Sequence, residues 1–376
     1  MLEGLTLWLL LPMGIALGLA LGRKAKGSDA ATLAAMSAVY DNPDRAIAVL
    51  TEAVEKDPAA AELNLTLGAL FRKRGEVDRA LRLHESVLAQ GTLKPDTQAL
   101  ALFELGLDCV KAGLLDRAVE LFKQSAQHPA YEAVSLEQLL PIHEQLSEWS
   151  EALAVAAKLE SIKGQSMALQ RAHYWLELAT LAEGENDADK ARKLAQQALE
   201  TDPACVRASL FLGRWYETRS RWTEAFDAYA RVAQQNPRFL SEVIAPIERV
   251  CTEAGKPALF SDFLDGLDAA HGQDSAVWLA RAQTMSNGFE QARYLADKLS
   301  RKPSWRGLIQ FLSLPPAREA GVLTAPVDAF RDALTQQLKQ RPQYQCEHCG
   351  FTPSLLFWRC PSCKEWGTVR PSEDSL

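Results

Sequence analysis

The protein has 376 residues, of which 47% are hydrophobic and 24% charged. These proportions are typical of folded proteins and exclude a largely disordered chain, while the length predicts about two or three folded units. Because 48 acidic residues outnumber 41 basic ones, giving a formal net charge of −7, the composition argues against nucleic acid as a partner. Seven cysteines are too few for a disulfide scaffold, and isolated thiols suit a reducing compartment.

The chain opens with an apolar run, LEGLTLWLLLPMGIALGLAL over residues 2–21, whose single charge is on Glu3. A helix of this length spans about 30 Å, which is the thickness of a bilayer core. Basic residues follow the run from Arg23 onward, whereas a cleaved signal peptide carries them in front. A buried core helix is the alternative, but such helices rarely lack charge for so long. We expect a single-pass membrane anchor over residues 1–22, with the remaining chain in the cytoplasm.

Three glycines within this anchor, Gly14, Gly18 and Gly22, recur at every fourth position and therefore share one helix face. Such a face lets a second transmembrane helix approach closely, whether it belongs to a partner or to a second copy of the chain in a homodimer. The alternative is that membrane helices simply tolerate glycine. We expect this face to pack against another membrane helix.

A repeating unit of 34 residues follows the anchor. This period is that of the tetratricopeptide repeat, a hairpin of two helices that buries its apolar face only when several copies stack. We therefore predict an all-α superhelical array over residues 23–303 and a helical connection over residues 304–340. The spacing recurs between equivalent residues of two copies: Ala179 and Gly213, Ala191 and Ala225, Pro203 and Pro237.

Small residues at fixed positions of each copy predict where the two helices of a hairpin touch. Prolines are predicted to end the second helices, because proline cannot continue the backbone hydrogen-bond ladder. Two copies, which contain Pro141 and Pro246, match the pattern poorly, and we expect these irregular copies to bend or break the superhelix. The small residues are Gly68, Gly106, Ala179 and Gly213 on first helices, and Ala80, Ala118, Ala191 and Ala225 on second helices.

Arrays of this kind bind peptides or protein surfaces on the concave face that the first helices line. Helical phase predicts exposed cations there, which would suit an acidic or C-terminal segment of a partner. The alternative for each is a solvated polar face without a partner. These cations are Arg72, Lys73, Lys111, Arg207 and Arg214.

A second basic cluster lies beside Trp305, near the predicted end of the array. Three roles remain open for it: docking the C-terminal module, facing anionic membrane lipid, or none. Its members are Lys298, Arg301, Lys302 and Arg306.

Four cysteines near the end of the chain form two Cys-x-x-Cys pairs, Cys346 with Cys349 and Cys360 with Cys363. Four thiolates with this spacing predict tetrahedral coordination of one metal ion, either zinc or a single iron. We expect His348, inside the first pair, to be a bystander. The predicted module covers residues 341–376 and is too small to fold well without its metal.

Two further features of this module follow from its residues. Gly350 directly follows the first pair and is expected to supply a positive φ. The apolar side chains exceed what so small a module can bury, so we expect it to pack against the helical array or a partner. These side chains are Phe351, Leu355, Leu356, Phe357, Trp358 and Trp366.

The cysteine pairs resemble the knuckles of rubredoxins, including the Cys-Pro-x-Cys form of the second pair. The loop between the pairs is shorter than in rubredoxins, and Lys364 stands where a glycine usually follows. These departures count against a redox role and keep zinc open. Because no G-x-S-x-G elbow, G-x-G-x-x-G fingerprint or complete zinc-protease motif occurs, we expect no enzyme.

The order of the three parts, anchor, tetratricopeptide array and four-cysteine module, resembles the lipopolysaccharide assembly protein B family of Gram-negative bacteria. The resemblance covers the whole chain and implies an adaptor that restrains lipopolysaccharide synthesis. It implies three partners: the deacetylase that commits precursor to lipid A, the membrane-anchored AAA+ metalloprotease that degrades it, and an inner-membrane regulator that opposes the adaptor. It also implies that Cys346, Cys349, Cys360 and Cys363 are the metal ligands.

Two other functions remain open. The chain could be a scaffold that gathers lipopolysaccharide synthesis and transport proteins without delivering any of them to a protease. It could instead be a rubredoxin-type electron carrier that uses its tetrathiolate site. Blocking the protease should mimic depletion of an adaptor but not depletion of a scaffold. An oxidised iron centre would be red, as an electron carrier requires, whereas a zinc centre would be colourless.

Overall fold

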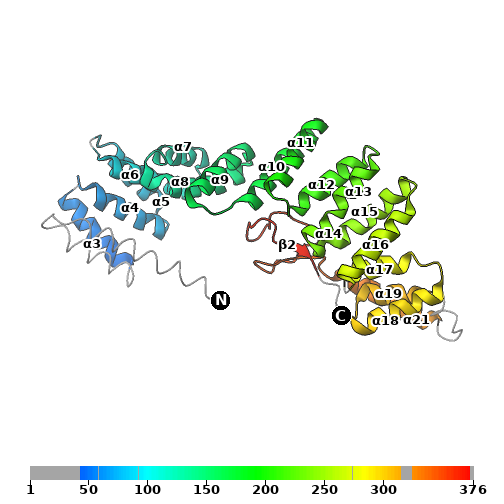
Figure 1. Ribbon diagram of the computed structural model, residues 1–376. Helices are drawn as coiled ribbons and strands as arrows, with labels where there is room; N and C mark the ends of the chain where they lie inside the picture. The colour runs from blue at the N-terminus through cyan, green and yellow to red at the C-terminus, as the bar shows by residue number, and fades with distance from the viewer. Residues whose placement is uncertain (1–42, 58, 92, 273, 315–323, 373–376) are drawn as a thin grey trace. The chain divides into compact units, whose positions relative to one another are not determined.

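The computed structural model describes residues 43–57, 59–91, 93–272, 274–314 and 324–372, and in these ranges the chain is almost entirely α-helical (Figure 1). The expected anchor over residues 1–22, with Gly14, Gly18 and Gly22, lies outside them. Among the helices of the described ranges, none is both long enough and apolar enough to cross a bilayer. The described residues divide into two compact units, one ending at Leu146 and the other beginning at Ser147.

The first unit consists of six described helices, of which α4 packs on α5 and α6 packs on α7 as antiparallel hairpins. Left-handed glycines end α4 and α6: Gly75 has φ 91° and Gly113 has φ 78°. The helices are α3 (Pro43–Lys56), α4 (Ala61–Arg74), α5 (Val77–Leu88), α6 (Pro95–Ala112), α7 (Leu115–Ser125) and α8 (Pro129–Leu146).

The second unit continues the hairpins, with α10 packed on α11, α12 on α13, α15 on α16 and α17 on α18. It ends in a two-stranded antiparallel sheet. Its elements are α9 (Trp149–Lys163), α10 (Ala168–Gly184), α11 (Ala188–Thr201), α12 (Val206–Glu217), α13 (Trp222–Ala230), α14 (Val232–Gln235), a 3₁₀ turn η1 (Pro237–Phe239), α15 (Leu240–Glu253), α16 (Pro257–His271), α17 (Ser275–Gln283), α18 (Gly288–Arg301), α19 (Trp305–Ser313), α21 (Thr324–Gln340), β1 (Tyr344–Cys346) and β2 (Val369–Pro371).

The predicted small residues lie at the contacts between paired helices. A Cβ atom added to Gly213 would lie 2.4 Å from the Tyr229 ring, and one added to Gly106 would lie 2.7 Å from the Phe122 ring. At Gly68 the neighbour is the imidazole of His84, at 2.2 Å. The residue 16 positions after each glycine therefore fills the space that the missing side chain leaves. This packing explains why the repeat pattern requires a small residue at that position.

The prolines of the two irregular copies lie within continuous helices. Pro141 lies inside α8 and Pro246 inside α15, and each helix continues beyond its proline. Proline removes one backbone donor and disturbs the turn before it. Packing of the apolar face compensates here, since Leu139 and Ile142 in α8, and Ile247 in α15, are almost completely buried. Neither proline ends its helix, and the expected bend or break of the superhelix at these two irregular copies stays a prediction.

Candidate metal centre

The C-terminal module is built around two tight turns that carry the four cysteines. Strand β1 ends at Cys346 and pairs with β2, so that Cys346 lies opposite Val369. Gly350 follows the first pair with φ 77°, as its position predicted, and the backbone N–H of Gly350 donates to the carbonyl of Cys346. Lys364 follows the second pair with φ 65°, and its N–H donates to the carbonyl of Cys360. The two turns therefore share one backbone conformation, with lysine in a position that favours glycine.

The four sulfur atoms lie within 4.8 Å of one another. The Sγ atoms of Cys346 and Cys363 are 3.8 Å apart, and those of Cys349 and Cys360 are 3.7 Å apart. A tetrahedron with metal–sulfur bonds of about 2.3 Å has edges of about 3.8 Å, so these separations fit one zinc or iron ion. His348 is exposed and does not belong to this group.

The surroundings of the sulfur atoms favour negative charge at one of them. Burial raises the pKa of Cys346, but hydrogen bonds from the Thr368 hydroxyl and from the backbone N–H groups of Cys349 and His348 outweigh it and lower the pKa to about 6. For Cys363 the N–H of Glu365 lowers the pKa, but burial and the neighbouring sulfurs raise it to about 12. Without a cation, the negative charge of one thiolate therefore disfavours ionisation of its neighbours. A divalent cation at the centre offsets this repulsion, because it stabilises all four thiolates together.

The module packs against the helices of the second unit through Trp366. The indole of Trp366 stacks on the imidazole of His173 in α10, with ring centroids 5.0 Å apart and 23° between the planes. Trp149 of α9 and Tyr174 of α10 contact the same indole edge-to-face, at 6.1 and 5.8 Å. Burial and the charges of Arg207 and Arg370 lower the pKa of His173 to about 3, so the imidazole in this stack is neutral at physiological pH.

A second aromatic contact lies beside the first. Trp358 stacks on Phe239 of η1, with centroids 5.7 Å apart and 18° between the planes. Arg370 of β2 covers the same Phe239 ring at 5.4 Å. Figure 1 shows the module, in red, beside α14, which directly precedes this turn.

Polar contacts also join the module to the helices of the second unit. The Tyr344 hydroxyl donates to Glu242 of α15 over 3.0 Å, and Arg238 of η1 forms an ion pair with Glu347. The docking partners His173, Phe239 and Glu242 were missed by the sequence analysis. Two of them are apolar or neutral groups inside helical patterns, so the sequence carries no signal that separates them from ordinary repeat residues.

Docking buries only part of the apolar surface of the module. Leu356 and Trp358 join the buried cluster around Phe239, and Trp366 is 7% exposed. Phe351 and Phe357 remain 39% exposed and Leu355 68%. One face of the module therefore packs against the array, as the sequence predicted. The side chains of Phe351, Leu355 and Phe357 lie outside this contact and stay accessible to solvent.

Two of the predicted concave cations are not the exposed groups that helical phase suggested. Arg72 is 17% exposed, because its guanidinium donates to Glu104 at 2.6 Å and to Asp108 at 2.7 Å on α6. Asp108 also contacts the buried His84, with 2.5 Å between Oδ2 and Nδ1. This network neutralises the charge of Arg72 within the array.

Arg207 is likewise paired, with Glu177 of the preceding hairpin at 2.8 Å, and is 13% exposed. The expectation that Arg72 and Arg207 are exposed was wrong, because carboxylates on neighbouring helices lie within reach of them; a partner-binding role for the five cations stays a prediction. Arg214 pairs with Glu183 at 2.9 Å but remains 60% exposed. Lys73 and Lys111 are exposed.

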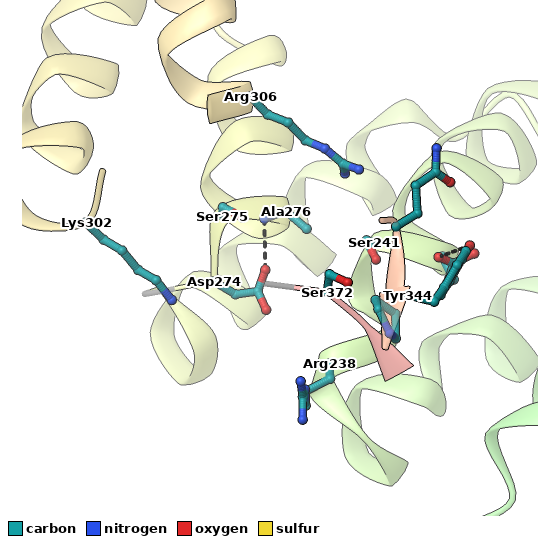
Figure 2. A pocket seen from close by; sticks show the side chains of 12 residues that line it. Arg238, Ser241, Asp274, Ser275, Ala276, Lys302, Arg306, Tyr344 and Ser372 are labelled. Carbon is teal, nitrogen blue, oxygen red and sulfur yellow. Dashed lines mark hydrogen bonds between the residues drawn. The ribbon is translucent and has the colours of Figure 1, made fainter. Parts of the chain in front are cut away.

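The four cations of the second basic cluster, Lys298 to Arg306, fall into two pairs with different surroundings. Lys298 donates to Asp268 at 3.1 Å, and Arg301 pairs with Asp297 of its own helix at 2.8 Å. Lys302 and Arg306 instead line a cavity whose opposite wall is Tyr344 and Ser372 of the module (Figure 2). Two members of the cluster thus face the C-terminal module, which was one of the three roles left open.

Residues 344–371 match the family described as the rubredoxin metal binding domain, and residues 41–95 and 176–238 match the tetratricopeptide repeat. The chain is 31% identical over 379 residues to lipopolysaccharide assembly protein B of Escherichia coli K12, and the match covers 97% of both chains. The chain belongs to the lipopolysaccharide assembly protein B family. The member from Haemophilus influenzae is 29% identical, again over 97% of both chains.

Family membership agrees with the fold and the metal centre. Membership confirms the tetratricopeptide array and the four-cysteine module together, as the resemblance of the sequence implied. Among solved structures, the complex of Naa15/Naa10 bound to HypK-THB aligns with 82% of this chain and 51% of that chain, at 11% identity and a TM-score of 0.44.

Proposed function

We propose that the protein is an inner-membrane adaptor in lipopolysaccharide assembly. In this proposal it binds the deacetylase that commits precursor to lipid A and brings it to a membrane-anchored AAA+ metalloprotease for degradation. Membership in a family named for lipopolysaccharide assembly supports the pathway. The observation that carries the adaptor role is the packing of Trp366 on His173. This contact holds the metal module against the repeat array, so that both can contribute to one surface for binding a partner protein.

The proposal includes a membrane tether. Residues 1–22 would anchor the chain, residues 23–303 would form the array in the cytoplasm, residues 304–340 the connection, and residues 341–376 the metal module. A tether confines the bound deacetylase to the membrane surface where the protease lies, and so raises its effective concentration. The glycine face of Gly14, Gly18 and Gly22 would contact the membrane helices of the protease, of the opposing regulator or of a second copy.

The metal has a structural role in this proposal. Cys346, Cys349, Cys360 and Cys363 would hold one zinc or iron ion, which supplies most of the folding free energy of so small a module. Folding in turn places Trp358 and Trp366 against the array. Catalysis is not part of the proposed role.

The deciding experiment measures the half-life of the deacetylase in cells depleted of the protein. An adaptor predicts a longer half-life and excess lipopolysaccharide, and inhibition of the protease should reproduce both effects. If depletion alters lipopolysaccharide while the half-life stays constant, the scaffold alternative is favoured and the adaptor is refuted. Deleting residues 1–22 should also lengthen the half-life if the tether matters.

The electron-carrier alternative rests on the same four sulfur ligands, which suit iron as well as zinc. Iron in such a site is red when oxidised and loses its colour on reduction, whereas zinc is colourless. A colourless protein with one zinc per chain would exclude electron transfer by this centre. A reversible colour change together with an unaltered deacetylase half-life would support it.

A further inference from the structure

Three consecutive residues near the end of the metal module contact both the array and the metal centre. Trp366 stacks on His173 of α10. Gly367 is buried against the same side chain, since a Cβ atom added to it would lie 3.3 Å from Nε2 of His173. The hydroxyl of Thr368 reaches Cys346, with 3.3 Å between Oγ1 and Sγ. A single short segment therefore joins helix α10 to one of the four sulfur atoms.

The distances around the Thr368 hydroxyl select sulfur as its acceptor. The hydroxyl has one proton to donate, and two acceptors lie near it: Sγ of Cys346 at 3.3 Å and the carbonyl of Glu365 at 3.4 Å. A bond between two oxygens is normally about 2.5–3.0 Å long, so the contact with the carbonyl is too long, whereas the larger sulfur atom accepts at this distance. The Glu365 carbonyl also accepts already from the N–H of Cys360 at 2.9 Å. A thiolate that has lost its proton to bind a metal is an anion and accepts the hydroxyl proton strongly.

Burial makes this hydrogen bond important for Cys346. The residue is 1% exposed, so solvent does not supply a donor to its sulfur. Cys349 is exposed and Cys363 is half-buried, so that water can reach them. Hydrogen bonds to metal ligands orient the ligands, and removal of one such partner typically costs about 10–100-fold in metal affinity. The hydroxyl of Thr368 is thus placed to affect how tightly a metal is held.

The array helps to fix the position of Thr368. Within the module, the Thr368 carbonyl accepts from the N–H of Glu347 at 2.9 Å, and the N–H of Gly367 donates to the carbonyl of Trp358 at 2.7 Å. The module has only a small hydrophobic core of its own to hold this segment. On the other side, three rings of α9 and α10 surround the indole of Trp366. Docking therefore restricts the two residues that directly precede Thr368.

We propose that docking on the array tightens metal binding by the four cysteines, and that Thr368 is the positioning residue through which it does so. The proposal rests on the proposed function, in which these cysteines hold one zinc or iron ion. Coupling between two binding events is reciprocal, so the metal strengthens docking by the same factor. Helix α10 of the array is in this sense an outer layer of the metal site.

The first test measures the affinity of the purified full chain for Zn²⁺ in a neutral detergent micelle, by competition with a chromophoric chelator. Thr368→Val keeps the shape of the side chain but removes the hydroxyl, and it should lower the affinity about tenfold or more. Thr368→Ser restores a hydroxyl and should recover most of this loss. Thr352→Val is the matched control, because Thr352 is an exposed threonine of the same module.

A spectroscopic measurement separates the hydrogen bond from a merely structural effect. With Co²⁺ in place of Zn²⁺, the charge-transfer band from sulfur to metal should lie at longer wavelength in Thr368→Val than in the unaltered chain. The reason is that a hydrogen bond lowers the energy of the sulfur electrons, and the variant lacks it. Thr368→Ser should return the band toward its original position.

The contribution of the array is tested from α10, outside the module. His173→Ala removes the stack and should weaken Zn²⁺ binding about tenfold, whereas His173→Phe retains a ring and should bind almost as the unaltered chain does. If the effect passes through Thr368, the double variant with Thr368→Val should bind no more weakly than Thr368→Val alone. Leu295→Ala controls for general destabilisation, since Leu295 is fully buried in a cluster of α17, α18 and α19 that contains no described residue of the module.

Three results would overturn the proposal: unaltered affinity in Thr368→Val, additive losses in the double variant, or equal weakening by Leu295→Ala. A tenfold loss still leaves the site filled in excess Zn²⁺, so every variant is compared at full loading. If the unaltered chain binds no metal, or Cys349→Ser binds it equally well, the proposed ligand set itself fails. Failure of the coupling and failure of the metal centre are therefore told apart, and neither measurement depends on the deacetylase.

Discussion

Trp366 of the metal module stacks face to face on His173 of helix α10, with 5.0 Å between the ring centroids. The indole is 7% exposed and the imidazole 4%, so the contact excludes water from both rings. Because stacked aromatic pairs add to the free energy of simple burial, this pair contributes to the attachment of the module to the array.

Trp366→Ala should release the module from the array without removing its metal. Truncation of a buried tryptophan costs about 3–5 kcal/mol, and here the loss falls on docking because the four cysteines are unchanged. Limited proteolysis should cut between α21 and the module sooner in the variant, while one metal ion per chain remains. Trp366→Phe should have a smaller effect, and unchanged proteolysis of Trp366→Ala would contradict the attachment.

The stability of the second unit should fall as the pH falls from 7.5 to 5. In the folded chain the pKa of His173 is about 3, whereas the ordinary histidine pKa of 6.5 applies once unfolding exposes the imidazole to water. The unfolded chain therefore binds a proton below about pH 6.5 that the folded chain does not, and the free energy of unfolding should drop by about 2 kcal/mol by pH 5.

Urea denaturation at several pH values measures this drop, with His173→Phe as the comparison. Phenylalanine retains the stack but does not titrate, so the unfolding free energy of the variant should lose about 2 kcal/mol less over the same range. Metal release at low pH affects both proteins equally and cancels in the difference. Identical pH dependence of the two proteins would mean that His173 is protonated in the folded state.

Cys349→Ser should lower the metal content of the chain and expose the module to protease, because one of four thiolate ligands is lost. Metal analysis of the purified variant checks the first effect and limited proteolysis the second. His348→Ala is the matched control from the same turn. Full metal content in Cys349→Ser, or equal loss in His348→Ala, would disagree with the proposed ligand set.

Gly213→Ala should destabilise the protein, although alanine is normally the better helix former by about 1 kcal/mol. The added methyl group would lie 2.4 Å from the Tyr229 ring, whose hydroxyl is held by Glu217 at 2.8 Å. Overpacking costs about 1–3 kcal/mol and should exceed the helix gain. In Gly184→Ala nothing lies within 4 Å of the new atom, so its melting temperature should stay equal or rise.

Asp108→Ala should cost about 3–5 kcal/mol, because it leaves the buried imidazole of His84 and the guanidinium of Arg72 without their shared carboxylate. Adding His84→Phe should recover part of this loss, since Phe122 fills the equivalent position beneath Gly106 in the next repeat. Urea denaturation of the single and double variants measures the difference. A double variant less stable than Asp108→Ala would show that phenylalanine does not fit beneath Gly68.

The sequence by itself determined the local elements of this protein. Residues 34 apart, such as Ala179 and Gly213, fix where paired helices touch, because only a small residue admits the ring that faces it. The spacing of Cys346 and Cys349, repeated in the second pair, brings four sulfurs within 4.8 Å through two local turns. Both features depend on contacts between residues close in the chain or on a strict period, so a linear pattern reveals them.

Only the tertiary structure decided which groups remain free and where the module attaches. Helical phase placed Arg72 and Arg207 on a polar face, but Glu104 and Glu177 on neighbouring helices neutralise them. Trp366 meets His173 across nearly two hundred residues of chain, and no period connects the two. Stacking, burial and ion pairing act through space, so their partners are set by how the hairpins pack.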